Sequence, residues 1–188
     1  EWTVGNINEG ELEFLAVPPA ERVHHHHNVM TLGPSSIEDG WVRLEQCHRN
    51  IDKVSRAQII FRAERIRNLR ITESTNIGRA WIEDASVQLS DIGEGSRLCL
   101  AAESFALSAN GDGSFYIDNG PFMRRFLDGY YPMRVSQKIV LADSGLTFLG
   151  IRPALQPGFD VTVTDESIDF DAWFEGRLLT EVKLIRQN

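Results

Sequence analysis

The stretch LCLAAESFALSANGDGSFYI, residues 98–117, indicates the fold class of this chain. Two runs rich in apolar residues are separated by Asn110-Gly111-Asp112-Gly113, four residues that tolerate positive φ angles. Such a cluster between two extended runs is a hairpin signal. It therefore predicts two antiparallel strands joined by a tight turn.

The same pattern of short apolar runs separated by turn residues repeats along the chain, with turn signals about every 8 to 12 residues, as in a β-sandwich or barrel. We expect an all-β, mostly antiparallel β-sandwich that forms a single domain over residues 1–188, although a division into two subdomains stays open. Residues 51–71 fit a helical face nearly as well as two strands, and we favour strands. The predicted strands lie near 11–17, 23–32, 40–48, 57–63, 66–73, 78–83, 86–91, 96–107, 114–118, 133–142, 146–151, 159–164, 168–175 and 178–186.

One short helix is expected over residues 121–128, in the stretch NGPFMRRFLDGYYP. Pro121 suits the first helical position, Arg124 and Asp128 have i,i+4 spacing, and Gly129 stands where a C-terminal cap belongs. Tyrosine and arginine are frequent in protein interfaces. The helix is thus either a plug at one end of the sandwich or a protein-binding site formed by Phe122, Arg124, Arg125, Tyr130 and Tyr131.

Composition argues against a membrane-spanning helix and against a nucleic-acid partner. No run of about 18 apolar residues is present, so no transmembrane helix is expected. Residues 49–79 carry eight Arg or Lys against three acids, but the whole chain has a net charge of -8. A nucleic-acid-binding domain is usually strongly basic, so we expect no nucleic-acid partner.

The two cysteines, Cys47 and Cys99, allow one intramolecular pairing. Strand alternation places each of them on the face opposite its strand's aliphatic pair, which argues against two buried free thiols. We therefore predict a disulfide. Disulfides persist in oxidising compartments, so we expect an exported protein, periplasmic or extracellular, from which a signal peptide has been removed.

RVHHHHNVM, residues 22–30, holds four of the five histidines. On a strand His24 and His26 share one face, and His25 and His27 share the other. Two imidazoles at this spacing can bind one ion, with His48, Asp39 or Glu45 as candidate third ligands, and imidazole-rich ligation favours Zn, Cu or Ni. The alternatives are an edge strand that requires no cofactor and the remnant of an affinity tag. Both faces border apolar residues, so the pattern does not choose between the pairs. The metal site that we predict consists of His24, His26 and His48.

Asp169 and Asp171 share one face of a strand within TDESIDFDAWFEG. A glycoside hydrolase uses two carboxyl groups on opposite sides of a bond, whereas a charged face also discourages edge pairing. No nucleophile elbow, zinc-protease motif, phosphate loop or dinucleotide fingerprint is present. An enzyme is thus the less favoured class. The leading hypothesis is a non-catalytic binding or assembly module with a protein partner, followed by a histidine-based metal-binding protein and then by a hydrolase.

Overall fold

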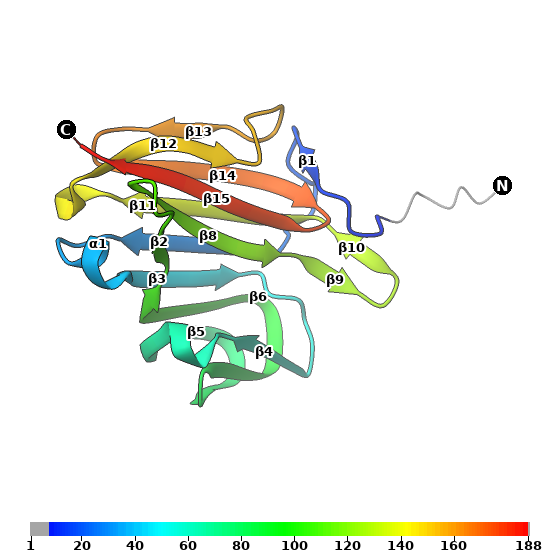
Figure 1. The fold of residues 1–188 in the computed structure, drawn as a ribbon. Helices are drawn as coiled ribbons and strands as arrows, with labels where there is room; N and C mark the ends of the chain where they lie inside the picture. The colour runs from blue at the N-terminus through cyan, green and yellow to red at the C-terminus, as the bar shows by residue number, and fades with distance from the viewer. Residues whose placement is uncertain (1–7, 188) are drawn as a thin grey trace.

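The computed structural model describes residues 8–187, which form two facing β-sheets (Figure 1). The larger sheet has the order β1-β14-β11-β2-β3-β6-β4, with β13 beside β14 and β5 beside β6. Its strands are β1 (Glu13–Leu15), β2 (His25–Thr31), β3 (Trp41–Arg49), β4 (Arg56–Ile60), β5 (Ile66–Glu83), β6 (Ser86–Phe105), β11 (Met133–Val140), β13 (Val161–Val163) and β14 (Ser167–Glu175). The smaller sheet contains β12 (Leu146–Arg152), β15 (Leu178–Arg186), β8 (Ser114–Phe122) and β7 (Leu107–Ala109), in that order.

The pairing is antiparallel throughout the described strands except between β2 and β11, which are parallel. Side chains from both sheets meet in one apolar cluster, to which Leu44 and Ile139 contribute from the larger sheet and Ile117 and Leu184 from the smaller one. The all-β, mostly antiparallel sandwich predicted from the sequence is therefore confirmed.

The turn at residues 110–113 is the hairpin loop that the sequence predicts, and it joins β7 to β8. Gly111 and Gly113 have φ angles of 82° and 89°, which an L-residue adopts at a cost. The Asp112 side chain accepts hydrogen bonds from the backbone N–H and the hydroxyl of Ser114, at 2.9 and 2.6 Å. The two glycines and the aspartate thus account for the tight reversal.

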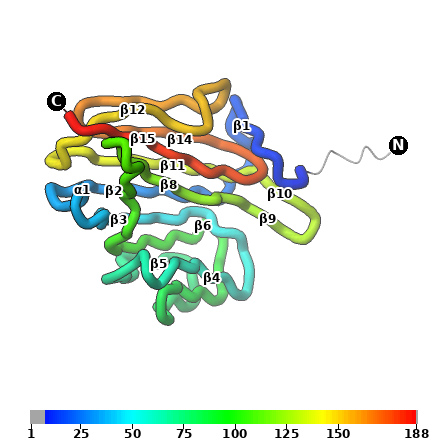
Figure 2. Tube along the Cα trace, viewed as in Figure 1, coloured from blue at the N-terminus to red at the C-terminus, as the bar shows by residue number. Residues whose placement is uncertain are grey.

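Strands β4, β5 and β6 form a part of the molecule that extends away from the sandwich (Figure 2). The first half of β6 pairs with β4 and the second half pairs with β3, while β5 follows β6 along most of its length. A separate apolar cluster, which includes Val87, Leu98 and Leu100, lies between these strands. The prediction of strands within residues 51–71 is confirmed, with a 3₁₀ turn at Ala63–Arg65 between β4 and β5.

The prediction of a helix over residues 121–128 is wrong. Strand β8 runs to Phe122, and β9 (Arg124–Phe126) and β10 (Gly129–Tyr131) form a two-stranded hairpin. A two-turn helix gains few hydrogen bonds for its nucleation cost, whereas the hairpin gains cross-strand pairs. Within residues 8–187 the short α-helix is α1 (Ser36–Asp39), which ends at Gly40 in the left-handed region, with φ 76°.

Cys47 and Cys99 stand directly opposite each other on β3 and β6 and form a disulfide, as predicted. The bridge ties together the two strands at which the β4–β6 part joins the sandwich. Among residues 8–187, no helix is long and apolar enough to cross a membrane.

Candidate functional site

The register of β2 against β3 assigns the histidines to two faces of the larger sheet. His26 and His48 are paired across the two strands, and His24 precedes β2 on the same face. This is the inner face, which is turned towards the smaller sheet. His25 and His27 lie on the outer face. The structure therefore shows which His-x-His pair faces the smaller sheet, a point that the sequence pattern left open.

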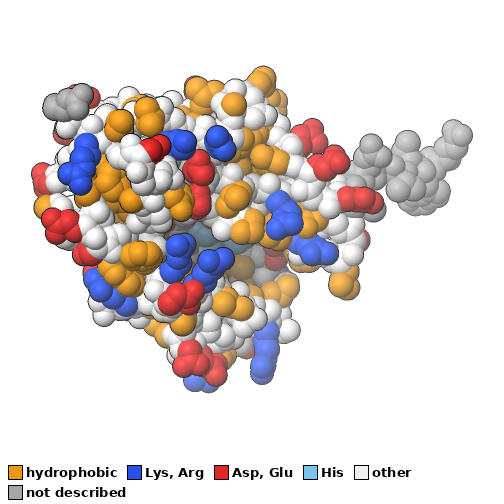
Figure 3. All heavy atoms as spheres, in the orientation of Figure 1, with side chains coloured by type: hydrophobic (Ala, Val, Ile, Leu, Met, Phe, Trp, Pro, Cys, Tyr) orange, Lys and Arg blue, Asp and Glu red, His pale blue; other side chains and the backbone are white. Residues whose placement is uncertain are grey.

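The three inner histidines line a cleft of about 440 Å³. It is bounded by β2, β3, β4 and the end of β8, where Figure 3 shows this side of the molecule hollowed at its centre. Apolar side chains make much of its wall, and none of its described lining residues is Asp, Glu, Lys or Arg. The lining consists of His24, His26, Asn28, Met30, Leu44, Gln46, His48, Gln58, Ile59, Ile60, Phe61, Ser104, Asn119, Gly120, Pro121, Phe122, Met123 and Met133.

Hydrogen bonds fix the tautomer of His48, which is 4% exposed. The amide oxygen of Gln46 lies 3.2 Å from His48 Nε2 and can only accept, so His48 Nε2 carries the proton. The lone pair of His48 is thus on Nδ1, which accepts a hydrogen bond from His24 Nε2–H at 3.0 Å. The two imidazole nitrogens therefore share one proton within the cleft.

His26 lies beside this pair but is turned differently. Its Nε2 is 2.9 Å from both Asn28 Oδ1 and Gln46 Nε2, and its ring centroid is 4.4 Å from that of His48. Accordingly, within residues 8–187 no group of three or more His, Cys, Asp or Glu side chains is arranged to hold a metal ion. The three predicted ligands all line the cleft, but only His24 and His48 face each other through their ring nitrogens.

All three inner histidines are neutral at pH 7. Burial lowers the pKa of His24 to about 4 and that of His26 to about 3. Burial, reinforced by the neighbouring imidazoles, holds the pKa of His48 well below its ordinary value of 6.5. Each ring consequently offers one unprotonated nitrogen under physiological conditions.

All three methionines of the chain line the same cleft. Met133 begins β11 next to β2, and the N–H of Arg134 donates to the carbonyl of His24 at 2.9 Å, so Met133 and His24 are neighbours across the strands. Met123 lies between β8 and β9. The Met30 sulfur differs from the other two, because Asn119 and Gln137 donate to it at 3.5 and 3.9 Å.

The outer face carries a second pocket, which at about 560 Å³ is larger than the cleft. The hydroxyl of Ser136 lies 2.6 Å from His25 Nε2 and 2.7 Å from His27 Nδ1. The acids proposed for a hydrolase are also here, and each has a basic partner: Asp171 pairs with Arg134, and Asp169 lies 3.8 Å from Lys138. These acids are held in ion pairs on one sheet face and do not flank the cleft.

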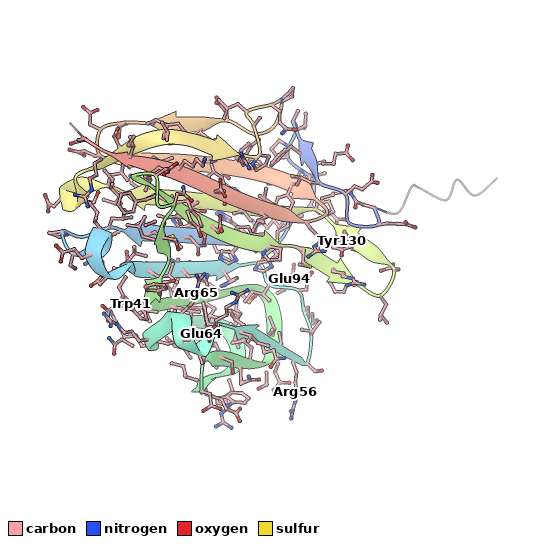
Figure 4. All side chains as sticks on the ribbon, in the orientation of Figure 1. Trp41, Arg56, Glu64, Arg65, Glu94 and Tyr130 are labelled. Carbon is pink, nitrogen blue, oxygen red and sulfur yellow. A yellow bond between two sulfur atoms is a disulfide. The ribbon has the colours of Figure 1, made fainter. Side chains whose placement is uncertain are left out.

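The residues predicted for protein binding belong to the β9–β10 hairpin, on which Figure 4 labels Tyr130. Phe122 is an exception, since it is 6% exposed and packs in the core, edge-on to His26. Arg124 forms an ion pair with Asp52 at 2.6 Å, and the Arg125 guanidinium stacks over Tyr130. The Tyr131 hydroxyl donates to Asp128 at 2.6 Å.

Sequence reasoning missed several residues of the cleft and of the β9–β10 hairpin. Leu127, at the tip of the hairpin, is fully exposed, and only the correct turn assignment would have placed it there. Gln46 and Asn28 share the strand parity of His48 and His26, a signal that was available in the sequence. The methionines had no local signal, because they come from three separate segments.

Comparison of the chain with protein-family models, with curated proteins and with solved structures finds no match. The cleft and the β9–β10 hairpin are therefore the features of the molecule from which a function can be inferred.

Proposed function

We propose that this protein binds one transition-metal ion in the cleft, with His24 and His48 as the first two ligands. The observation that carries the proposal is the approach of His24 Nε2 to His48 Nδ1, at 3.0 Å, in a cleft lined by neutral side chains. In a tetrahedral site two imidazole nitrogens about 2.0 Å from the ion are about 3.3 Å apart. Binding the ion requires the His24 proton to move from Nε2 to Nδ1 and both rings to turn until their lone pairs converge, while the distance between the two nitrogens changes by only a few tenths of an ångström.

The surroundings of His48 support this role. Histidine ligands usually donate their second ring N–H to an acceptor, which fixes the tautomer and the orientation of the ring. Gln46 is such an acceptor for His48. His26 would become a third imidazole ligand if its ring turned away from Asn28, and otherwise another lining group or water would complete the coordination.

Protons compete weakly for these ligands. A metal ion needs the unprotonated imidazole, so a histidine of ordinary pKa loses metal affinity below pH 6.5. The pKa of His24, lowered by burial to about 4, leaves its ring unprotonated well below that pH.

The test is a titration of chelator-treated protein, purified without immobilised metal, with Zn²⁺, Ni²⁺, Cu²⁺ and, under anaerobic conditions, Cu⁺, followed by calorimetry. We expect one ion per chain, and we expect the His24→Gln variant to bind more than about 100-fold more weakly, since even an outer partner of a ligand is worth 10- to 100-fold. The matched control is His27→Gln, on the opposite face of the same strand, which should retain wild-type affinity. Equal affinity in the two variants, or no bound ion in the wild type, would refute the proposal.

A second function is favoured by the β9–β10 hairpin, which we propose as a docking element for a protein partner. Its tip exposes Leu127 completely and Phe126 to 39%. Exposed apolar side chains on a projecting element gain most by burial in a complex. Leu127→Asp should abolish binding of a co-purifying protein, while Leu149→Asp, an exposed control on β12, should not. Binding that survives the Leu127 substitution would count against this role.

A further inference from the structure

The donor atoms in the cleft differ from those of a typical zinc site. Zinc is bound mostly by thiolate, imidazole and carboxylate, whereas thioether sulfur favours monovalent copper. The chain has three methionines, and all of them line this cleft together with His24 and His48. Methionine also fills irregular gaps in cores, so the position of each sulfur has to be considered separately.

Met133 and Met123 are the two lining thioethers that we consider as ligands. Met133 neighbours His24 across the β2–β11 pair, on the face that carries the cleft, and it is buried in the apolar cluster that includes Phe122. Met123 joins β8 to β9 and is partly exposed. Met30 is placed differently, because its sulfur already accepts hydrogen bonds from Asn119 and Gln137.

Charge gives an independent reason to favour a monovalent ion. None of the described side chains that line the cleft is acidic, and the Asp52 carboxylate near its rim is neutralised by Arg124. The cost of transferring an ion from water to a medium of low dielectric constant rises with the square of its charge. A divalent ion would therefore lose about four times as much solvation energy as a monovalent one, with no carboxylate to compensate.

Resting on the metal-binding function proposed above, we infer that the ion is monovalent copper and that the thioethers of Met133 and Met123 complete its coordination with His24 and His48. The site then consists of two neutral imidazoles and two neutral thioethers. Ag⁺, a monovalent soft ion of similar chemistry, should bind in the same place.

The inference is tested by anaerobic transfer of Cu⁺ from its bicinchoninate complex to the full chain, with Zn²⁺ titrated in parallel. Three Met→Leu variants are compared, because leucine is close to methionine in volume and core swaps of this kind are well tolerated. We expect Met133→Leu and Met123→Leu each to weaken Cu⁺ binding about tenfold or more and to leave Zn²⁺ binding within about threefold. Met30→Leu, the control that lines the same cleft, should leave Cu⁺ binding within about threefold.

X-ray absorption of the Cu⁺-loaded wild type gives a readout that does not depend on folding of the variants. A sulfur shell around copper is expected, and it should diminish in Met123→Leu, whose side chain is partly exposed. A shell of nitrogen alone, or Cu⁺ affinity unchanged in the Met123→Leu Met133→Leu double variant, would overturn the inference. If in that case His24→Gln still abolished binding, the metal-binding function would stand without the thioethers. A wild-type chain that binds neither Cu⁺ nor Zn²⁺ would refute both.

Discussion

Acidification should destabilise the metal-free protein because its inner histidines are held neutral. The pKa of His24 is about 4 and that of His26 about 3 in the folded chain, against 6.5 for a solvated histidine, with burial as the main cause. Below pH 6.5 the unfolded chain therefore binds protons that the folded chain does not. By linkage, the stability that these neutral histidines allow is fully present above pH 6.5, and it is lost as the pH falls towards the folded pKa values.

The size of the loss at pH 5 follows from these pKa values. For His24 the unfolding free energy falls by RT ln[(1 + 10^1.5)/(1 + 10^-1)], which is about 2 kcal/mol. The same calculation for His26 gives nearly the same loss. The result is insensitive to the folded pKa, because pH 5 lies above both values. Together the two histidines account for about 4 kcal/mol, which is a large part of the 5–15 kcal/mol typical of a domain.

Urea unfolding of chelator-treated protein, followed by tryptophan fluorescence at several pH values between 7.5 and 5, measures this loss. Replacing His26 with glutamine removes one titrating group, so the fall in unfolding free energy between pH 7.5 and 5 should be about 2 kcal/mol smaller than in the wild type. His27→Gln should change this fall less, because burial lowers the pKa of His27 less strongly than that of His26. An equal pH slope in the wild type and in the His26→Gln variant would show that this imidazole is not held neutral by the fold.

Three further predictions concern the disulfide, a buried hydroxyl and the amide that orients His48. Replacing Cys47 and Cys99 together with alanine should lower the unfolding free energy by about 4 kcal/mol, since the bridge closes a loop of 52 residues; an unchanged urea midpoint would contradict this. Thr180→Val should raise stability by about 1 kcal/mol, because the Thr180 hydroxyl is fully buried without a hydrogen-bond partner, and a lower melting temperature would count against that assignment. Gln46→Leu should weaken metal binding 10- to 100-fold while His24 and His48 remain, and unchanged affinity by calorimetry would show that Gln46 does not orient His48.

Strand alternation predicts which histidines share a face of the sheet. It does not predict how β2 is paired in register with β3. The sequence places His24 and His26 on one face with certainty once a strand is assumed, and it offers His48 as a third group. It could not tell which pair faces inward, because Val23 and Val29 flank one pair and Met30 and Leu32 the other. That choice depends on the pairing of His26 with His48 and on which side of the sheet the second sheet packs.

The helix error has a related cause. Within MRRFLDGYY the helical spacing of Arg124 and Asp128 and the turn signal Asp128-Gly129 are both present. Local propensity cannot separate them, because a short helix and a short hairpin are each marginal alone. Continuation of the chain from β8 favours the hairpin, with Phe126 and Tyr131 packed edge-to-face across its two strands.

The cleft lies where the polar row of the inner face interrupts the apolar core. Asn28 pairs with Gln46 on one side and with Gln137 on the other, and all three are buried. The Gln137 amide oxygen has no hydrogen-bond partner, which costs about 1–3 kcal/mol, and the neutral imidazoles add the acid sensitivity worked out above. Apolar side chains in this row would avoid both penalties. The same burial that makes the row costly keeps the imidazoles neutral and holds His24 against His48, and a metal ligand requires neutral imidazoles. An ion present at 100 times its Kd would return about 2.7 kcal/mol to the folded state, enough to offset the cost of one such group.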